Sequence, residues 1–250
     1  MSFINDFIET FKDKLSFTHK PAATKLDFQK IRLLRQQKND KIITNSLINK
    51  NIDACLTLIN EKELKRVYEQ TGKTKEEILE ECSKSELLAK VLAGRIAKKA
   101  SRQGTQDEYL QLEICNSIGK DLGVRITNIG ASEYRATKSG EIISKKEMKE
   151  KNITKDMCLK SFDGRIEGKM TGWIFAKVVF GNGGHQDSVF IEADTLCEWV
   201  SKHEREETFV VLIDTDLESK FISLKKKYSE VKNLLILDHY SFQEFILDNM

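Results

Sequence analysis

Apolar residues in the first hundred positions recur every three or four residues, which is the spacing of an amphipathic helix. Thr74 followed by Glu77 has the pattern of a capping box, because the hydroxyl accepts from a free helical amide while the carboxylate reaches back. The sequence therefore predicts a helical region over residues 1–100. The clearest apolar spacing is at Phe3, Ile4, Phe7, Ile8 and Phe11, and in the stretches 56–67 and 78–92.

The pattern changes after a turn-forming segment at 100–105, where short apolar runs begin to alternate with helical spacing. The run 173–180 is apolar almost throughout, so we expect a strand in the middle of a sheet. The strand-like run 159–162 is expected to pair with it. The other predicted elements are strands at 124–129, 208–213 and 233–237, and helices at 106–119, 145–151, 187–202 (with Asp187 as N-cap), 217–228 and 242–247.

This order predicts an α/β protein with two parts. A helical N-terminal region, residues 1–100, precedes a three-layer α/β domain with a mixed sheet, residues 101–250. The sheet should begin with a hairpin and then add strands through helical crossovers.

Charge and composition narrow the class of protein. Lysine and arginine number 41 against 39 acids, a net charge of +2, with 40% hydrophobic residues, which indicates a globular chain and argues against coating nucleic acid by charge alone. The five cysteines are widely spaced without a CxxC pair, so we expect buried thiols. No segment approaches the roughly 18 apolar residues of a membrane span, so we expect a cytoplasmic protein with no membrane partner.

Three charged residues do not fit a plain apolar core. Lys177 interrupts the run 173–180, where a lysine is costly unless it is paired or reaches an open edge. Glu192 lies on the apolar stripe of the predicted helix 187–202 and needs a cation or a donor. Asp163 follows the run 159–162, just before the expected turn residue Gly164. Although each has an ordinary structural explanation, together they can converge on one site.

These residues resemble the PD-(D/E)XK nuclease superfamily, and in particular type II restriction endonucleases. The resemblance rests on the segments Ser161-Phe-Asp163-Gly and Trp173-Ile-Phe-Ala-Lys177, followed by Gly183-Gly-His-Gln-Asp187 at the start of a helix. It covers roughly residues 100–250 and implies a restriction-endonuclease-like α/β fold. It also implies that acids hold a divalent metal while Lys177 positions the attacking water. The segment 101–108 is similar to the first core helix of the family, where Glu108 would support a second metal or the lysine.

One departure from the family pattern bears on the metal site. The position two before Lys177 is Phe175, where the family usually has an acid. Some members carry this acid on the following helix instead, so the resemblance assigns the metal pair to Asp163 and Glu192. Mg²⁺ is the implied cofactor, with Mn²⁺ as a substitute, because it needs only one or two carboxylates besides the substrate phosphate.

The implied activity is sequence-specific, metal-dependent cleavage of double-stranded DNA by a homodimer. Residues 135–169 contain ten bases against six acids and either form a solvated face or follow the DNA backbone. The N-terminal helices are expected to serve dimerisation or to clamp DNA. The residues that we expect to contact DNA, with turn and capping roles as alternatives, are Arg102, Gln103, Arg135, Lys138, His185 and Gln186.

Two other functions stay open at the level of sequence. The missing acid at Phe175 also suits a degenerate nuclease fold that binds DNA or a partner protein without cleaving. Asp214 and Asp216 follow a predicted strand and resemble the metal site of Toprim-type domains. The alternative for both aspartates is that they cap the following helix.

Overall fold

The computed structural model describes residues 21–99, 104–130, 132–181 and 184–250. The predicted helical pattern around Phe3 lies outside these residues. The chain divides into two compact units, one formed by Gly104–Met250 with the chain up to Leu26 and the other by Asp27–Gln103.

The helical prediction for the N-terminal part is confirmed over the described residues. The elements are α2 (Pro21–Ile48), the 3-10 helix η1 (Ile52–Leu58), α3 (Glu61–Thr71), α4 (Lys75–Lys84) and α5 (Glu86–Ile96). The capping box predicted at Thr74 and Glu77 is present at the start of α4. An isolated bridge between Ile59 and Ala97 joins the two ends of the α3–α5 segment. The core of this unit includes Ile43, Leu47, Ile59, Cys82, Ala89 and Ile96, all fully buried.

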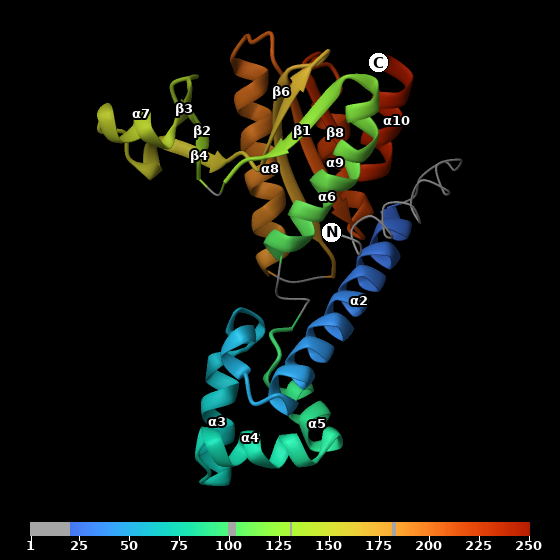
Figure 1. The fold of residues 1–250 in the computed structure, drawn as a ribbon. Coiled ribbons are helices and arrows are strands. Elements are labelled where there is room, and N and C mark those ends of the chain that lie inside the picture. The colour runs from blue at the N-terminus through green and yellow to red at the C-terminus, as the bar shows by residue number, and fades with distance from the viewer. Residues whose placement is uncertain (1–20, 100–103, 131, 182–183) are drawn as a thin grey trace. The chain divides into compact units, whose positions relative to one another are not determined.

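The unit that contains Gly104–Met250 has a mixed five-stranded sheet, as predicted (Figure 1). Its strand order is β1-β5-β6-β7-β8, with β6 in the middle. The pairs β1–β5 and β5–β6 are antiparallel, whereas β6–β7 and β7–β8 are parallel. The bounds are β1 (Val124–Asn128), β5 (Gly164–Gly168), β6 (Gly172–Val179), β7 (Thr208–Thr215) and β8 (Leu234–Leu237).

Helices cover both faces of this sheet and give the three predicted layers. Side chains alternate along β6, so Ile174 packs with α6 (Gly104–Gly119) and α10 (His239–Asn249), while Phe175 packs with the opposite layer. That layer consists of α8 (Gly184–Lys202) and α9 (Glu218–Lys227). Because β6 is covered on both sides, a charged residue within it must find partners inside the protein.

A second, three-stranded sheet is inserted between β1 and β5, and it corrects one prediction. Its order is β3-β2-β4, with β2 (Tyr134–Thr137), β3 (Ile142–Ser144), α7 (Lys145–Glu150) and β4 (Cys158–Ser161) (Figure 1). The run 159–162 was expected to pair with 173–180, but β4 pairs with β2, and β5 is the hairpin partner of β6. The sequence concealed β5 because its residues Gly164–Gly168 include two glycines and two charges.

Two smaller expectations are also corrected. Gly164 is not a turn residue but the buried first residue of β5, where an added Cβ would lie 3.3 Å from side-chain atoms of Leu112 and Ile174. Asp187 lies inside the first turn of α8 and is not its N-cap. The expectation of buried thiols is confirmed, since all five cysteines are free and buried. Over the described residues, no helix combines the length and apolar character that a membrane crossing requires.

Candidate functional site

Lys177, Asp163 and Glu108 come together near the carboxyl end of β6. The ammonium Nζ of Lys177 lies 2.9 Å from Oε1 of Glu108 and 3.2 Å from Oδ2 of Asp163. The side chains of the three residues are 17%, 20% and 22% exposed for Lys177, Glu108 and Asp163 respectively. The site is therefore partly buried but open to solvent.

The position of Asp163 follows from where β5 begins. The backbone of Asp163 donates to the carbonyl oxygen of Ile174 at 2.8 Å, which holds the residue beside β6. Its Oδ2 also accepts a hydrogen bond from the backbone nitrogen of Ala176 at 2.9 Å. The carboxylate thus replaces a strand partner for β6 and is fixed next to Lys177.

Glu108 reaches the same point from α6. One turn further along this helix, Gln111 Nε2 donates to Oδ2 of Asp214 at 2.6 Å, and Leu112 packs on the sheet. Residues three and four apart share a helix face, so the contacts of Gln111 and Leu112 orient Glu108 toward the end of β6. The lysine predicted to need a partner therefore has two.

The electrostatics of the site follow from two carboxylates that share one ammonium group. Burial raises the pKa of Asp163, and the charge of Glu192 adds to the effect. Burial likewise raises the pKa of Glu108, with a further contribution from the charge of Asp163. Burial lowers the pKa of Lys177, but the charges of Asp163 and Glu108 outweigh it, so the net pKa is raised. Lys177 is a cation at neutral pH and donates hydrogen bonds.

Glu192 is near this group but binds a different cation. Its Oε1 lies 3.1 Å from Nζ of Lys160, and its side chain is 25% exposed. Its charge contributes to raising the pKa of Asp163, which places the two carboxylates in electrostatic range. No local pattern identifies Lys160 as the partner, because the pairing depends on how β4 packs against α8.

The structure brings together two of the six residues expected to contact DNA. Arg135 and Lys138 line one pocket beside α8, together with Lys155 and Lys160. Arg102 and Gln103 lie outside the described residues. His185 and Gln186 belong to the first turn of α8, but their side chains lie outside the described part of the chain.

The helix-capping role expected of Asp214 and Asp216 is not seen at the start of α9. Asp214 is fully buried, and its Oδ1 lies 2.7 Å from Nδ1 of His239. Asp216 accepts from the backbone nitrogen of Gly181 at 2.8 Å and pairs with Lys25 at 2.6 Å. Leu217 is the N-cap, without a side-chain cap, so the capping interpretation is wrong. The sequence did not reveal Gln111 and His239 as partners of Asp214.

The carboxylate oxygens next to Lys177 fit a hard divalent cation that keeps several water ligands. Asp163 and Glu108 supply oxygen atoms, and their raised pKa values mark carboxylates whose charge is incompletely compensated. In the described residues no cluster of three or more His, Cys, Asp or Glu side chains is arranged to hold a metal by protein ligands alone. Such a cation would therefore need water or substrate oxygens to complete its coordination.

Comparison with known proteins does not assign the chain to a family. No protein-family model matches the chain, and neither a curated protein nor a solved structure is significantly similar to it.

Proposed function

We propose that this chain is a divalent-metal-dependent endodeoxyribonuclease that cleaves double-stranded DNA, of the type II restriction kind. The observation that carries the proposal is the contact of Lys177 with both Asp163 and Glu108 at the carboxyl end of the middle strand. Two acids and one lysine at this strand end can hold a metal ion and stabilise the negative charge that develops during phosphodiester hydrolysis. Sequence specificity and action as a homodimer belong to the same proposal and rest on the resemblance.

Each residue has a distinct part in this proposal. Asp163 is fixed by the backbone of Ala176, so its second oxygen, Oδ1, is the group best placed to hold Mg²⁺. Glu108 provides the second carboxylate, and Glu192, paired with Lys160, adds negative charge near Asp163. A bound Mg²⁺ supplies positive charge where negative charge develops on the phosphate.

Lys177 acts in this proposal as a hydrogen-bond donor. Its raised pKa keeps the ammonium protonated at neutral pH, so it does not accept the proton of the attacking water. It orients that water through the lone pair of the oxygen and stabilises the negative charge that develops. As the new P–O bond forms, the bond from phosphorus to the leaving sugar oxygen breaks. The water proton leaves to solvent through the exposed part of the site, and the leaving oxygen takes up a proton from solvent.

The test is cleavage of plasmid and genomic DNA by the purified protein with Mg²⁺ or Mn²⁺, followed by sequencing of the DNA ends. The Lys177→Ala and Asp163→Asn variants should lose activity by about 100-fold or more, the scale seen when one transition-state donor is removed. Glu198→Gln is the matched control, because Glu198 lies exposed on α8 and pairs with Lys202. It should keep full activity.

Two results would count against the proposal. Cleavage that survives in Lys177→Ala would exclude the site. Absence of cleavage by the wild type with either metal, together with retained DNA binding, would assign a binding module instead, as the buried Phe175 in place of an acid would allow.

A further inference from the structure

A basic pocket lies between the three-stranded sheet and α8, beside the candidate site. Its volume is about 520 Å³. One side is formed by residues of β2 and β4 together with Lys138, just after β2, and Lys155, shortly before β4. Ile191, Glu192 and Thr195 of α8 form the other side. Glu192 connects it electrostatically to the candidate site, since its charge acts on Asp163.

The positive charges in this pocket exceed the negative ones. The lining contains Arg135, Lys138, Lys155 and Lys160, with Glu192 as the acid. Glu192 pairs with Lys160 at 3.1 Å. Among the described residues, no carboxylate oxygen lies within ion-pair distance of the other three cations. Asp156 lies outside the lining but within electrostatic range of Lys138. Even with Asp156 included, the cations outnumber the acids, so the pocket carries net positive charge.

Among these cations, Arg135 is the strongest evidence for an anion-binding site because it is buried. The residue is 9% exposed, and its guanidinium donates to the carbonyl oxygen of Leu159 and to Oγ of Ser132, both at 2.9 Å. Both acceptors are neutral, and its buried Nε has no hydrogen-bond partner in the described structure. A buried charge without a counter-ion is costly, so the pocket is prepared for an anion from outside.

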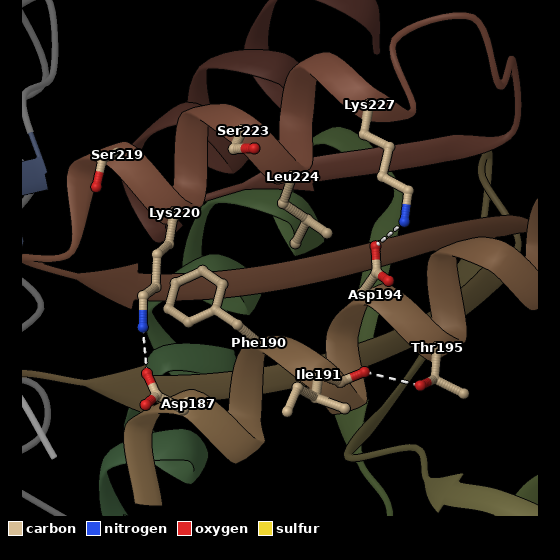
Figure 2. A pocket seen from close by; sticks show the side chains of 10 residues that line it. All are labelled: Asp187, Phe190, Ile191, Asp194, Thr195, Ser219, Lys220, Ser223, Leu224 and Lys227. Atoms are coloured by element: carbon tan, nitrogen blue, oxygen red, sulfur yellow. Dashed lines mark hydrogen bonds and ion pairs between the residues drawn. The ribbon is translucent and has the colours of Figure 1, made fainter. Parts of the chain in front are cut away.

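A second groove, between α8 and α9, provides a contrast (Figure 2). It has a volume of about 620 Å³ and a floor that includes Phe190 and Leu224. Its two lysines are each paired, Lys220 with Asp187 and Lys227 with Asp194, the latter at 2.6 Å. The larger groove is thus neutralised by its own side chains, whereas the smaller pocket has unmatched charge.

We propose that the pocket of Arg135, Lys138 and Lys155 binds a backbone phosphate of DNA that flanks the phosphate placed at Asp163. This inference rests on the proposed function for its position along the strand. Lysine and arginine are the usual ligands of DNA phosphates, and the apolar side chains of Leu159 and Ile191 offer a surface for the adjoining sugar. The inserted three-stranded sheet then has the task of holding the strand against α8.

The test measures binding of duplex DNA in EDTA, where metal-dependent cleavage does not occur. The double variant Lys138→Ala/Lys155→Ala should bind at least about tenfold more weakly at moderate salt. The slope of log K against log salt, which is negative, should decrease in magnitude by about 0.9, because the variant neutralises one phosphate fewer than the wild type. The control is Lys146→Ala/Lys149→Ala on α7, which removes the same charge from positions outside the pocket. It should keep most of the affinity and the slope.

A third variant tests geometry. Arg135→Lys keeps the charge but loses the planar fork, and it should also weaken binding if the guanidinium meets a phosphate. Circular dichroism would check that each variant is folded.

Equal losses of affinity in the two lysine pairs, or no DNA binding by the wild type, would overturn the inference. Pocket-dependent binding without cleavage would support this inference while the proposed nuclease activity fails. Cleavage with binding insensitive to the pocket would do the reverse.

Discussion

The Asp163 carboxylate lies 3.2 Å from the Lys177 ammonium, although Asp163 lies in the bend before β5 and Lys177 lies within β6. Their contact depends on the hairpin of β5 and β6, which sets Asp163 beside the strand that carries Lys177. Glu108 completes the group from α6. The site therefore depends on both the hairpin and the packing of α6 against the sheet.

The relative importance of Glu108 and Glu192 can be measured with isosteric variants. Glu108 shares Lys177 with Asp163, whereas Glu192 is held by Lys160. We therefore expect Glu108→Gln to raise the Mg²⁺ concentration for half-maximal cleavage by more than tenfold, at the scale of about 10–100-fold for disturbed metal sites. Glu192→Gln should have a smaller effect. A larger effect of Glu192→Gln would show that the acid on α8 is the metal ligand, as the sequence predicted.

The pH dependence of stability should differ in sign between two glutamates. Burial raises the pKa of Glu108, so the folded state holds the proton more tightly than the unfolded state. The stability that wild type has relative to Glu108→Gln should be greatest at acid pH. It should fall as the pH rises from the unfolded carboxyl pKa through the raised folded pKa. Urea unfolding at a series of pH values measures this.

Glu147 provides the control of opposite sign. The hydrogen bond from the backbone of Ser144, with a second from its hydroxyl, lowers the pKa of Glu147 at the start of α7. Its contribution is present above the unfolded pKa and is lost as the pH falls through the folded pKa. The stability of wild type relative to Glu147→Gln should therefore rise with pH. Parallel curves for the two variants would contradict the assignment.

Restoring an acid at the position two before Lys177 should fail. Phe175 is 1% exposed and packs in the core between the sheet and α8. Phe175→Glu loses the apolar contacts and buries a carboxyl, so we expect a loss of at least about 3 kcal/mol in the free energy of unfolding, the lower end for a deleted core phenylalanine. Denaturant unfolding and cleavage assays measure both effects. A stable variant that cleaves faster would show that this position still accepts a metal ligand.

Asp214 should prove structural. Gln111 and His239 both bond to this buried carboxylate. Removing it leaves the His239 ring nitrogen without this acceptor and leaves Gln111 with two longer bonds of 3.4 Å, to the carbonyl oxygens of Lys177 and Leu212. In denaturant unfolding, Asp214→Ala should lose about 1–3 kcal/mol for each donor left unpaired. Asp216→Ala should lose less, because its side chain is 17% exposed and water can replace it. A variant of Asp214 that kept its stability but lost cleavage would favour the Toprim-like alternative.

The sequence predicted features that depend on near neighbours along the chain. The capping box at Thr74 rests on a side chain three residues away, and helical spacing is likewise a local property. The apolar run that became β6 identified the middle strand. Lys177 was recognisable as a residue in need of partners because the run around it is apolar.

Only the tertiary structure decided which residues meet across long separations. Lys177 and Glu108 are 69 residues apart, and Gln111 and Asp214 are 103 apart. The strand pairing is a second example. The run 159–162, expected to pair with β6, pairs with β2 as strand β4, and β5 is the hairpin partner of β6. Pairing of strands, burial of Arg135 and the contact of Glu192 with Lys160 all depend on packing between distant segments. A local pattern shows that a charge needs a partner, but packing selects the partner.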